Sequence, residues 1–267
     1  MKMYLAGLTF LPQVTLSIHG GGFDDSLVSR VNMLESFYYV KPWQTAIIHR
    51  LKSFMLDSGA YTFAYNPKNA GVTVDWEEYL DSYAAYIVEN DVRLFFELDI
   101  DPIVGFPKVE QMRARLEAKT GRRCIPVWHQ ERGLDDWYAT CEEYDYVAIG
   151  GIADKGRTSI ERYLPALIRE AHRRGAKVHG LGYTNLGKLP HIAFDSVDST
   201  AWLYGNRGGF LYSWDGRTMH KRESASNQRL KARDAARHNF IEWVRMGEDM
   251  EGSGMRKPAT TKLSEVS

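Results

Sequence analysis

The sequence predicts an α/β protein built as a (β/α)8 barrel, followed by a short C-terminal helical extension and a disordered tail. Eight short apolar runs recur at fairly even intervals, and helical patterns fill most of the gaps between them. Polar residues gather where the runs end. The carboxyl ends of all barrel strands meet at one face, where barrel active sites lie, so this pattern favours a barrel over a doubly wound open sheet.

The apolar runs are rich in β-branched, aromatic and leucine residues and alternate little with polar ones. Such runs are typical of strands that helices cover, as in a parallel sheet. We expect strands at residues 3–8, 37–40, 54–56, 94–98, 124–128, 146–149, 178–181 and 192–197.

Two stretches carry a helical stripe. From Trp76 to Val88 the apolar residues follow i, i+3, i+4 spacing. A second stripe runs from Ile160 to Ala171, begins with capping-box spacing at Thr158 and ends in basic residues. We expect weaker helices at residues 27–34, 108–119 and 134–143.

The chain divides by composition into three parts. Residues 1–203 form the predicted barrel, which is the expected catalytic domain. Residues 204–246 form the predicted extension, with a hairpin around Gly208-Gly209 and a helix at residues 228–246. Residues 247–267 are polar and are expected to be a disordered tail.

Charge and cysteine usage exclude several classes of protein. The 34 basic and 34 acidic residues cancel, so the chain is not a globally basic nucleic-acid binder, although a local basic face remains open. The two cysteines, Cys124 and Cys141, form no secreted disulfide framework and no four-cysteine metal site. No run approaches the ~18 apolar residues of a membrane span, so we expect a soluble, cytoplasmic protein.

Three clusters of carboxylates stand at the expected ends of strands three, four and eight. They are Asp57, Asp99 with Asp101, and Asp195 with Asp198. A charge at the end of a buried strand loses water and needs a partner or a function. Any single one could instead cap a helix or close a loop. The histidines are scattered without metal-ligand spacing, so no metal site is predicted.

Glycines also follow several strands. Gly59 comes after Asp57-Ser58, and the next strands end in Gly150-Gly151 and in His179-Gly-Leu-Gly182. Glycines at such positions allow tight turns and expose backbone N–H groups to a ligand. A glycine pair alone more often marks a turn than a binding loop.

One basic segment follows the predicted barrel. Its candidate phosphate-binding residues are Arg207, Lys221, Arg222, Arg229, Lys231 and Arg233. Aromatic residues just before it could stack on bases or pack on the barrel. A solvated helix face is the alternative for the basic residues.

In this order along the chain, the strand-end motifs resemble those of the tRNA-guanine transglycosylase superfamily, over about residues 50–240. The matching motifs are Phe54-Met-Leu-Asp-Ser-Gly59, Phe96-Glu-Leu-Asp99, Val147-Ala-Ile-Gly-Gly151, His179-Gly-Leu-Gly182 and Phe194-Asp-Ser-Val-Asp-Ser-Thr200. The superfamily is a (β/α)8 barrel that exchanges guanine in a polynucleotide for a 7-deazaguanine base. An aspartate attacks C1′, and the incoming base resolves the glycosyl-enzyme.

The resemblance implies a role for each matching residue. Asp57 would contact the base and transfer a proton, and Asp99 would accept hydrogen bonds from the guanine edge. The nucleophile is Asp198 or Asp195, since two alignments of the motif are possible, with Asp198 preferred. The remaining substrate-binding residues implied are Ser58, Gly59, Gly150, Gly151, His179, Gly180 and Gly182.

The chain departs from the tRNA enzymes in one respect that bears on its substrate. It has no cysteine after Cys141, so it lacks the Cys3His zinc subdomain that helps hold tRNA. It thus resembles the compact DNA-modifying branch, found in bacteriophages and bacterial DNA-modification islands, which inserts a preQ0-like 7-deazaguanine into DNA.

That resemblance implies DNA and a free 7-deazaguanine base as partners, no cofactor, no membrane, and a host cytoplasm if the gene is phage-encoded. A queuine or preQ transglycosylase acting on tRNA is the alternative within the enzyme class. A non-catalytic barrel that only positions nucleic acid is a second alternative, and a carbohydrate-active barrel with paired carboxylates is a third.

Overall fold

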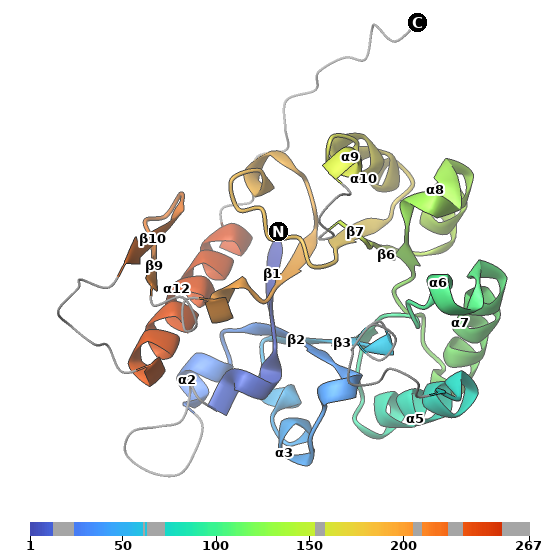
Figure 1. The fold of residues 1–267 in the computed structure, drawn as a ribbon, viewed down its shortest axis with the longest axis horizontal. Coiled ribbons are helices and arrows are strands. Elements are labelled where there is room, and N and C mark those ends of the chain that lie inside the picture. Colours follow the sequence, from blue (N-terminus) through green and yellow to red (C-terminus); the bar gives the residue numbers. More distant parts are fainter. Residues whose placement is uncertain are drawn as a thin grey trace, which may run out of the picture.

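The computed structural model describes residues 1–12, 24–60, 62, 73–152, 158–204, 210–223 and 232–252. The fold is α/β, with one eight-stranded parallel sheet that curls and is flanked by helices (Figure 1). The strands are β1 (Lys2–Ala6), β2 (Asn32–Ser36), β3 (Ser53–Asp57), β4 (Leu94–Phe95), β5 (Val127–Trp128), β6 (Tyr146–Ile149), β7 (Lys177–Gly180) and β8 (Ser196–Ser199). Their order in the sheet is β4-β3-β2-β1-β8-β7-β6-β5.

The curl of the sheet brings distant strands toward one another. Phe96, just after β4, lies with its ring 5.3 Å from that of His179 on β7, although β4 and β7 are not neighbours in the sheet. The two end strands, β4 and β5, are joined by one isolated bridge between Phe96 and Ile125. Two backbone hydrogen bonds, Ile125 N to Phe95 O at 2.8 Å and Glu97 N to Ile125 O at 3.1 Å, support this bridge.

Helices surround the sheet (Figure 1). The longer ones are α5 (Trp76–Glu89), α7 (Phe106–Thr120), α8 (Gly133–Glu143), α10 (Leu164–Arg173) and α12 (Ala232–Gly252). Short turns of helix are η1 (Leu8–Phe10), α2 (Asp25–Val28), η2 (Phe37–Tyr39), α3 (Pro42–Thr45), η3 (Ile48–Arg50), α6 (Asp101–Val104), η5 (Gln130–Arg132), α9 (Thr158–Glu161), η6 (Leu189–His191) and η7 (Ala201–Leu203). An antiparallel hairpin of β9 (Phe210–Trp214) and β10 (Met219–Glu223) packs against α12.

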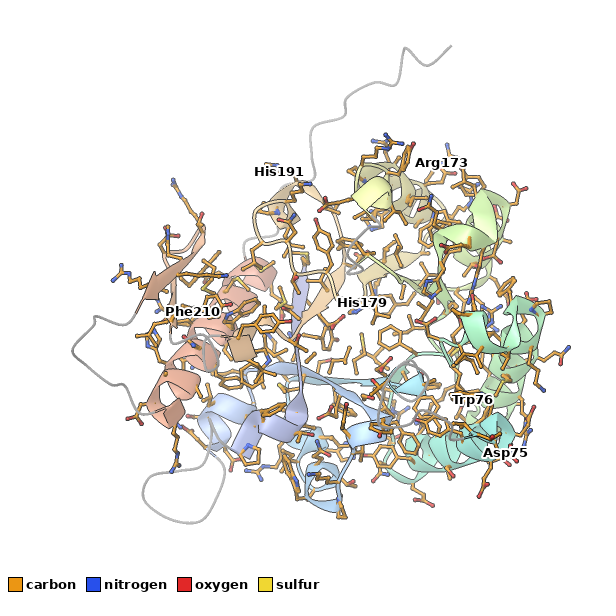
Figure 2. The ribbon with its side chains drawn as sticks, in the orientation of Figure 1. Asp75, Trp76, Arg173, His179, His191 and Phe210 are labelled. Atoms are coloured by element: carbon orange, nitrogen blue, oxygen red, sulfur yellow. The ribbon has the colours of Figure 1, made fainter. Side chains whose placement is uncertain are left out.

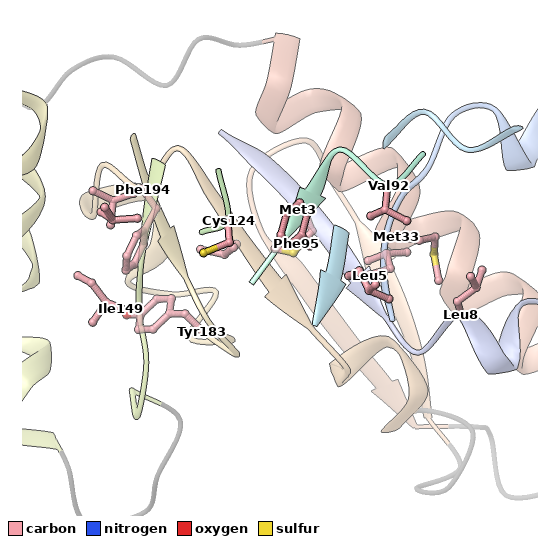
Figure 3. Packing of buried hydrophobic residues seen from close by; sticks show 14 of the residues in the cluster. Met3, Leu5, Leu8, Met33, Val92, Phe95, Cys124, Ile149, Tyr183 and Phe194 are labelled. Atoms are coloured by element: carbon pink, nitrogen blue, oxygen red, sulfur yellow. The ribbon is translucent and has the colours of Figure 1, made fainter. Parts of the chain in front are cut away.

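Alternate residues of each strand pack on opposite faces of the sheet. On β1, Met3 and Leu5 belong to the large apolar cluster between sheet and helices, parts of which Figure 3 shows. Tyr4 and Ala6 belong to a second, smaller cluster with Phe96 and other inward-facing residues. Because both faces of β1 are buried from Met3 to Ala6, that stretch is a continuous apolar run.

The second strand differs from the prediction. Residues 37–40 are mostly a 3₁₀ turn, and the strand is Asn32–Ser36, which overlaps the end of the helix expected at residues 27–34. Two polar side chains are buried in this strand with partners far along the chain. Asn32 donates to Glu251 Oε1 at 2.6 Å, and Glu35 accepts from Thr9 N at 2.7 Å. These tertiary contacts override the helical character of the local sequence.

The last strand and the extension also differ. The eighth strand is Ser196–Ser199, later than the expected residues 192–197. The described hairpin turns at residues 215–218, and the turn expected at Gly208-Gly209 lies outside the described residues. Helix α12 continues to Gly252, past the expected end at residue 246, because Met246 and Met250 are buried and the N-terminus donates to Met250 O at 3.3 Å.

Candidate active site

A cavity of about 1170 Å³ lies at the carboxyl ends of the strands. Every strand of the sheet contributes to its lining, either with a residue near its own end or with one that follows it. Five of the predicted site residues line the cavity: Asp57, Asp99, Gly151, Gly182 and Asp198. The strand-end residues from positions 57 to 198 therefore meet at one place, as parallel strands with the same direction require.

Asp198 has two hydrogen-bond partners on one of its oxygens. On β8, its Oδ1 accepts from the backbone N–H of Gly182 at 2.5 Å and lies 3.2 Å from His179 Nε2. Gly182 adopts a φ of 68°, in the left-handed region that glycine tolerates, and this turns its N–H toward the carboxylate. Oδ2 makes no hydrogen bond within the described residues. The side chain thus presents one fixed and one unengaged oxygen.

Asp57 ends β3 on the opposite side of the curl. Burial raises the pKa of its carboxyl to about 7, the hydrogen bond from Gly59 N opposes this shift, and the charges of Asp99 and Asp198 add to it. The Gly59 N–H donates to Asp57 Oδ2 at 3.0 Å. A carboxyl with this pKa exchanges protons near neutral pH, as a general acid or base needs to do.

Asp99 forms a pair with His129 at the third side of the cavity. Asp99 Oδ1 lies 2.6 Å from His129 Nε2, and both side chains are largely buried. Burial lowers the pKa of His129, but the hydrogen bond and charge of Asp99 outweigh it, so the pKa is raised above its usual value. His129 comes directly after β5, so its position at a strand end is the sequence signal that points to it.

An ion network lies beside this pair. Arg132 donates from Nε and Nη2 to the two oxygens of Asp101, at 2.5 and 2.6 Å, and lies 3.4 Å from Glu97 Oε1. Burial raises the pKa of Glu97 to about 7, against the charges of Arg132 and Arg113. The network links the segments that follow β4 and β5, the two strands that are joined by the single bridge. Its charges are paired, because an unpaired charge is costly to bury.

Glu35 is a cavity residue that sequence reasoning missed. It lies on β2, and its Oε2 accepts from Thr9 N and Oγ1 and from Gln44 Nε2, at 2.7 to 2.9 Å. Burial raises its pKa, and these hydrogen bonds oppose the shift. Glu35 was missed because residues 27–34 were expected to form a helix. A strand at residues 32–36 would have placed Glu35 near a strand end, where the other candidate carboxylates lie.

The predicted glycines serve several structural purposes. A Cβ on Gly59, whose φ is 72°, would lie 2.7 Å from Tyr38 Cβ, and one on Gly150 would lie 2.6 Å from His129 Cε1. On Gly180, a Cβ would lie 2.8 Å from the Phe194 ring. The N–H of Gly150 donates to Trp128 O at 2.9 Å, which leaves Gly151 as the member of the pair that lines the cavity.

Besides Gly59, Gly150 and Gly180, three further predicted residues are not part of the cavity lining. Ser58 and His179 are fully buried, Ser58 behind the turn at the end of β3 and His179 beneath Asp198. Asp195 precedes β8 at the other end of the strand, where its Oδ2 accepts from Val178 N at 2.8 Å and lies 2.8 Å from His172 Nε2. The structure thus separates Asp195 from the strand-end carboxylates.

The predicted basic segment is partly described. Lys221 and Arg222 are exposed on β10, and Arg233 is exposed on α12. Lys221 Nζ lies 5.0 Å from the centre of the Phe210 ring across the hairpin. Arg207, Arg229 and Lys231 lie outside the described residues. The hairpin stands at the edge of the molecule, on the outer side of α12 (Figure 1).

The described part of the chain contains no group of three or more His, Cys, Asp or Glu side chains arranged to hold a metal ion. None of its helices has the length and apolar character of a membrane span. No protein-family model matches the sequence, and no curated protein matches it. The function of the protein is therefore inferred from the geometry of the cavity and from the order of the motifs.

Proposed function

We propose that this protein is a guanine transglycosylase that replaces guanine in DNA with a 7-deazaguanine base. The observation that carries the proposal is the meeting of two different carboxylates in one cavity. Within the described residues, one oxygen of Asp198 has two hydrogen-bond partners and the other has none, whereas Asp57 has a pKa of about 7. Two carboxylates with separated roles suit one nucleophile and one acid or base.

The covalent step uses Asp198. Its carboxylate oxygen attacks C1′ of the target deoxyguanosine, the C1′–N9 bond breaks, and guanine leaves with the bonding electron pair. The Gly182 N–H at 2.5 Å fixes the orientation of the attacking group. Asp195, at the other end of β8, takes no part in this step.

The proton transfers use Asp57. In its protonated form it gives a proton to the departing guanine, and as a carboxylate it then accepts the proton from N9 of the incoming 7-deazaguanine. The incoming base attacks C1′ and releases the Asp198 carboxylate, so the enzyme returns to its starting state. A pKa of about 7 allows both directions of transfer near neutral pH.

Asp99 and His129 suit the recognition of the base. The Asp99 carboxylate accepts hydrogen bonds from the N1–H and exocyclic amine of a guanine-like edge, and His129, 2.6 Å from it, holds its orientation. Gly151 lines the same cavity with a φ of 69°, and its backbone N–H is a donor for the base carbonyl.

DNA reaches this cavity as a flipped or single-stranded nucleotide. Asp198 is buried, so a base within a duplex stack is out of its reach. Tyr39 and Tyr204 line the cavity and are about half exposed, which suits stacking on neighbouring bases. Lys221 and Arg222 on the hairpin supply phosphate contacts.

We also infer that the curled sheet is a (β/α)8 barrel whose weakest seam lies between β4 and β5. The inward cluster, the ring contact between Phe96 and His179, and the Phe96–Ile125 bridge all support this finer description.

A base-exchange assay tests the proposed function. Labelled guanine or preQ0 is offered with duplex DNA, single-stranded DNA and tRNA in parallel. Label in DNA, preferentially single-stranded DNA, supports the proposal. Label in tRNA alone assigns the tRNA activity instead. No label in any nucleic acid, from folded protein, contradicts the transglycosylase assignment.

A further inference from the structure

A chain of hydrogen bonds runs from Asp198 through the interior of the curled sheet. We propose that His179, Ser196 and Tyr146 are positioning residues, which orient the Asp198 carboxylate for attack without touching the substrate. The proposal deepens the function proposed above and rests on it for the role of Asp198. It also makes a separate claim about the tautomer of His179, which can be tested without activity.

The distances define the chain. His179 Nε2 lies 3.2 Å from Asp198 Oδ1, and His179 Nδ1 lies 2.5 Å from Ser196 Oγ. Ser196 Oγ is in turn hydrogen-bonded to the hydroxyl of Tyr146, at the start of β6. The chain therefore crosses from β8 to β7, returns to β8 and ends on β6. Figure 2 shows His179 inside the molecule, toward the strands.

The chemistry of the groups sets the direction of every hydrogen bond. A carboxylate only accepts, so His179 Nε2 carries the proton and donates to Asp198. With a neutral ring, Nδ1 accepts from the Ser196 hydroxyl. Since the Ser196 proton is used in this bond, Tyr146 donates its own proton to Ser196 Oγ. One consistent set of donors thus points from Tyr146 toward Asp198.

Among the described residues, His179 has no further hydrogen-bond partner besides Asp198 and Ser196. Its side chain is fully buried, with the Tyr4 ring at 6.2 Å and the Phe96 ring at 5.3 Å. The Tyr4 hydroxyl is hydrogen-bonded to Ser53 Oγ at 2.9 Å, and not to the imidazole. A ring in such a place keeps its rotamer and tautomer, since any other arrangement would leave a buried polar atom unpaired.

This arrangement decides which Asp198 oxygen reacts. Gly182 N and His179 Nε2 both donate to Oδ1, so they hold the carboxylate plane and leave Oδ2 for attack on C1′. The Asp198 carboxylate shares the cavity with other acidic side chains, including Asp57, Asp99 and Glu35. Misplacing a reacting group by about 1 Å costs up to about 100-fold in rate.

The first test is ¹⁵N nuclear magnetic resonance of histidine-labelled wild-type protein. The chain has 8 histidines, and His179→Gln identifies the resonances of His179. We expect the Nε2–H tautomer, with Nδ1 unprotonated. Ser196→Ala is expected to shift the Nδ1 resonance. An Nδ1–H tautomer in the wild type would overturn the proposal, because Nε2 would then direct a lone pair at the carboxylate.

The second test is kinetic. His179→Leu removes both hydrogen bonds at similar volume, and we expect kcat for exchange to fall about 100-fold with KM for DNA little changed. His179→Gln carries an amide donor near the position of Nε2 and is expected to restore at least about 10-fold of that loss. Tyr146→Phe, which keeps the ring and lies far from the substrate, is expected to lower kcat several-fold.

The outcomes separate this proposal from the proposed function. Equal kcat values for the Leu and Gln variants, or wild-type kcat in both Tyr146→Phe and Ser196→Ala, would overturn the positioning role. If the wild type exchanges no base with any nucleic acid, the proposed function and the kinetic role both fail. The tautomer then decides on its own whether His179 donates to Asp198.

Discussion

Gly182 and Asp198 are joined by a hydrogen bond of 2.5 Å, from the backbone N–H that follows β7 to the carboxylate on β8. The bond depends on the positive φ of 68° at Gly182, which L side chains rarely adopt. Gly182, which the sequence suggests as a turn residue, therefore also donates a hydrogen bond to the proposed nucleophile.

Gly182→Ala is expected to lower the exchange rate about 10-fold and the free energy of unfolding by about 1 kcal/mol. A Cβ strains the backbone at this φ, which destabilises the fold and displaces the N–H that donates to Asp198. Gly121→Ala is a matched control. Gly121 has a φ of 64°, ends α7 far from the cavity and has open space at its Cβ position. It should lose similar stability and keep full activity. Equal activity in both variants would remove the role of the Gly182 N–H.

Asp198→Asn is expected to lower exchange by at least about 10⁴-fold while the thermal unfolding transition stays cooperative, because the amide is no nucleophile. The control is Asp195→Asn, on the same strand segment but at its other end, where the side chain is bonded to Val178 N and His172. That variant should retain most of its activity. Loss of exchange in Asp195→Asn alone would reverse the assignment of the nucleophile.

The exchange rate is expected to change with a pKa near 7 that belongs to Asp57. Asp57→Asn removes the titrating group, so this limb of the pH profile should disappear and the remaining rate should be low at every pH. Rates measured from pH 5 to 9 in wild type and variant check this. A limb near 7 that persists in Asp57→Asn would assign it to another group, of which Glu97 is one.

The same pKa predicts a pH effect on stability. The folded-state pKa of Asp57 lies above the unfolded value of 3.8, so the folded protein binds more protons between pH 4 and pH 7. Its stability then falls as pH rises through this range, by on the order of 4 kcal/mol for a fully shifted group. Asp57→Asn lacks the effect, so its stability relative to wild type should grow from pH 4 to pH 8 in denaturant titrations.

Asp99→Ala is expected to lower discrimination between guanine and other purines by about 10- to 100-fold, with covalent chemistry retained. Gly150→Ala should act in the same direction, because a Cβ there would lie 2.6 Å from His129 Cε1 and displace the partner of Asp99. Competition between labelled guanine and hypoxanthine measures the effect. Unchanged discrimination in Asp99→Ala would remove its base-reading role.

Lys221→Ala and Arg222→Ala are each expected to raise KM for DNA and to reduce the slope of log affinity against log salt by about one. The KM for the free base should not change. Arg173→Ala, which removes an exposed arginine paired with Glu170 on α10, is the control. A salt slope that all three variants share with the wild type would show that the hairpin does not bind DNA.

Much of the fold follows from local pattern. The stripe from Trp76 predicts α5 almost to the residue, and the run at residues 146–149 coincides with β6. Helix α5 buries one regular stripe of residues, and β6 is a short run that is almost wholly buried, so the local pattern suffices for both. Strand β2 was not predicted, because it buries two polar residues, Asn32 and Glu35, whose hydrogen-bond partners lie more than twenty residues away in the sequence.

To choose between Asp195 and Asp198 as the proposed nucleophile, one must know at which residue β8 begins. Residues on one face of a strand are two apart, so two aspartates three apart do not share a face. The strand begins at Ser196, which turns Ser196 and Asp198 inward toward His179 and leaves Asp195 before the strand. The contacts of His179 could not be predicted in the same way, since its hydrogen-bond partners, Ser196 and Asp198, lie on the neighbouring strand β8, and their pairing depends on the register of the two strands.

The central claim is that Asp198 forms a covalent bond to the sugar of DNA, and trapping that bond tests it most directly. Enzyme mixed with single-stranded DNA is quenched in acid, digested with nuclease and trypsin, and sequenced by mass spectrometry. The tryptic peptide of residues 189–207 contains both Asp195 and Asp198. We predict a deoxyribosyl adduct on Asp198, which increases when free base is omitted. An adduct on Asp195 or Asp57, or exchange without any adduct, would contradict the account.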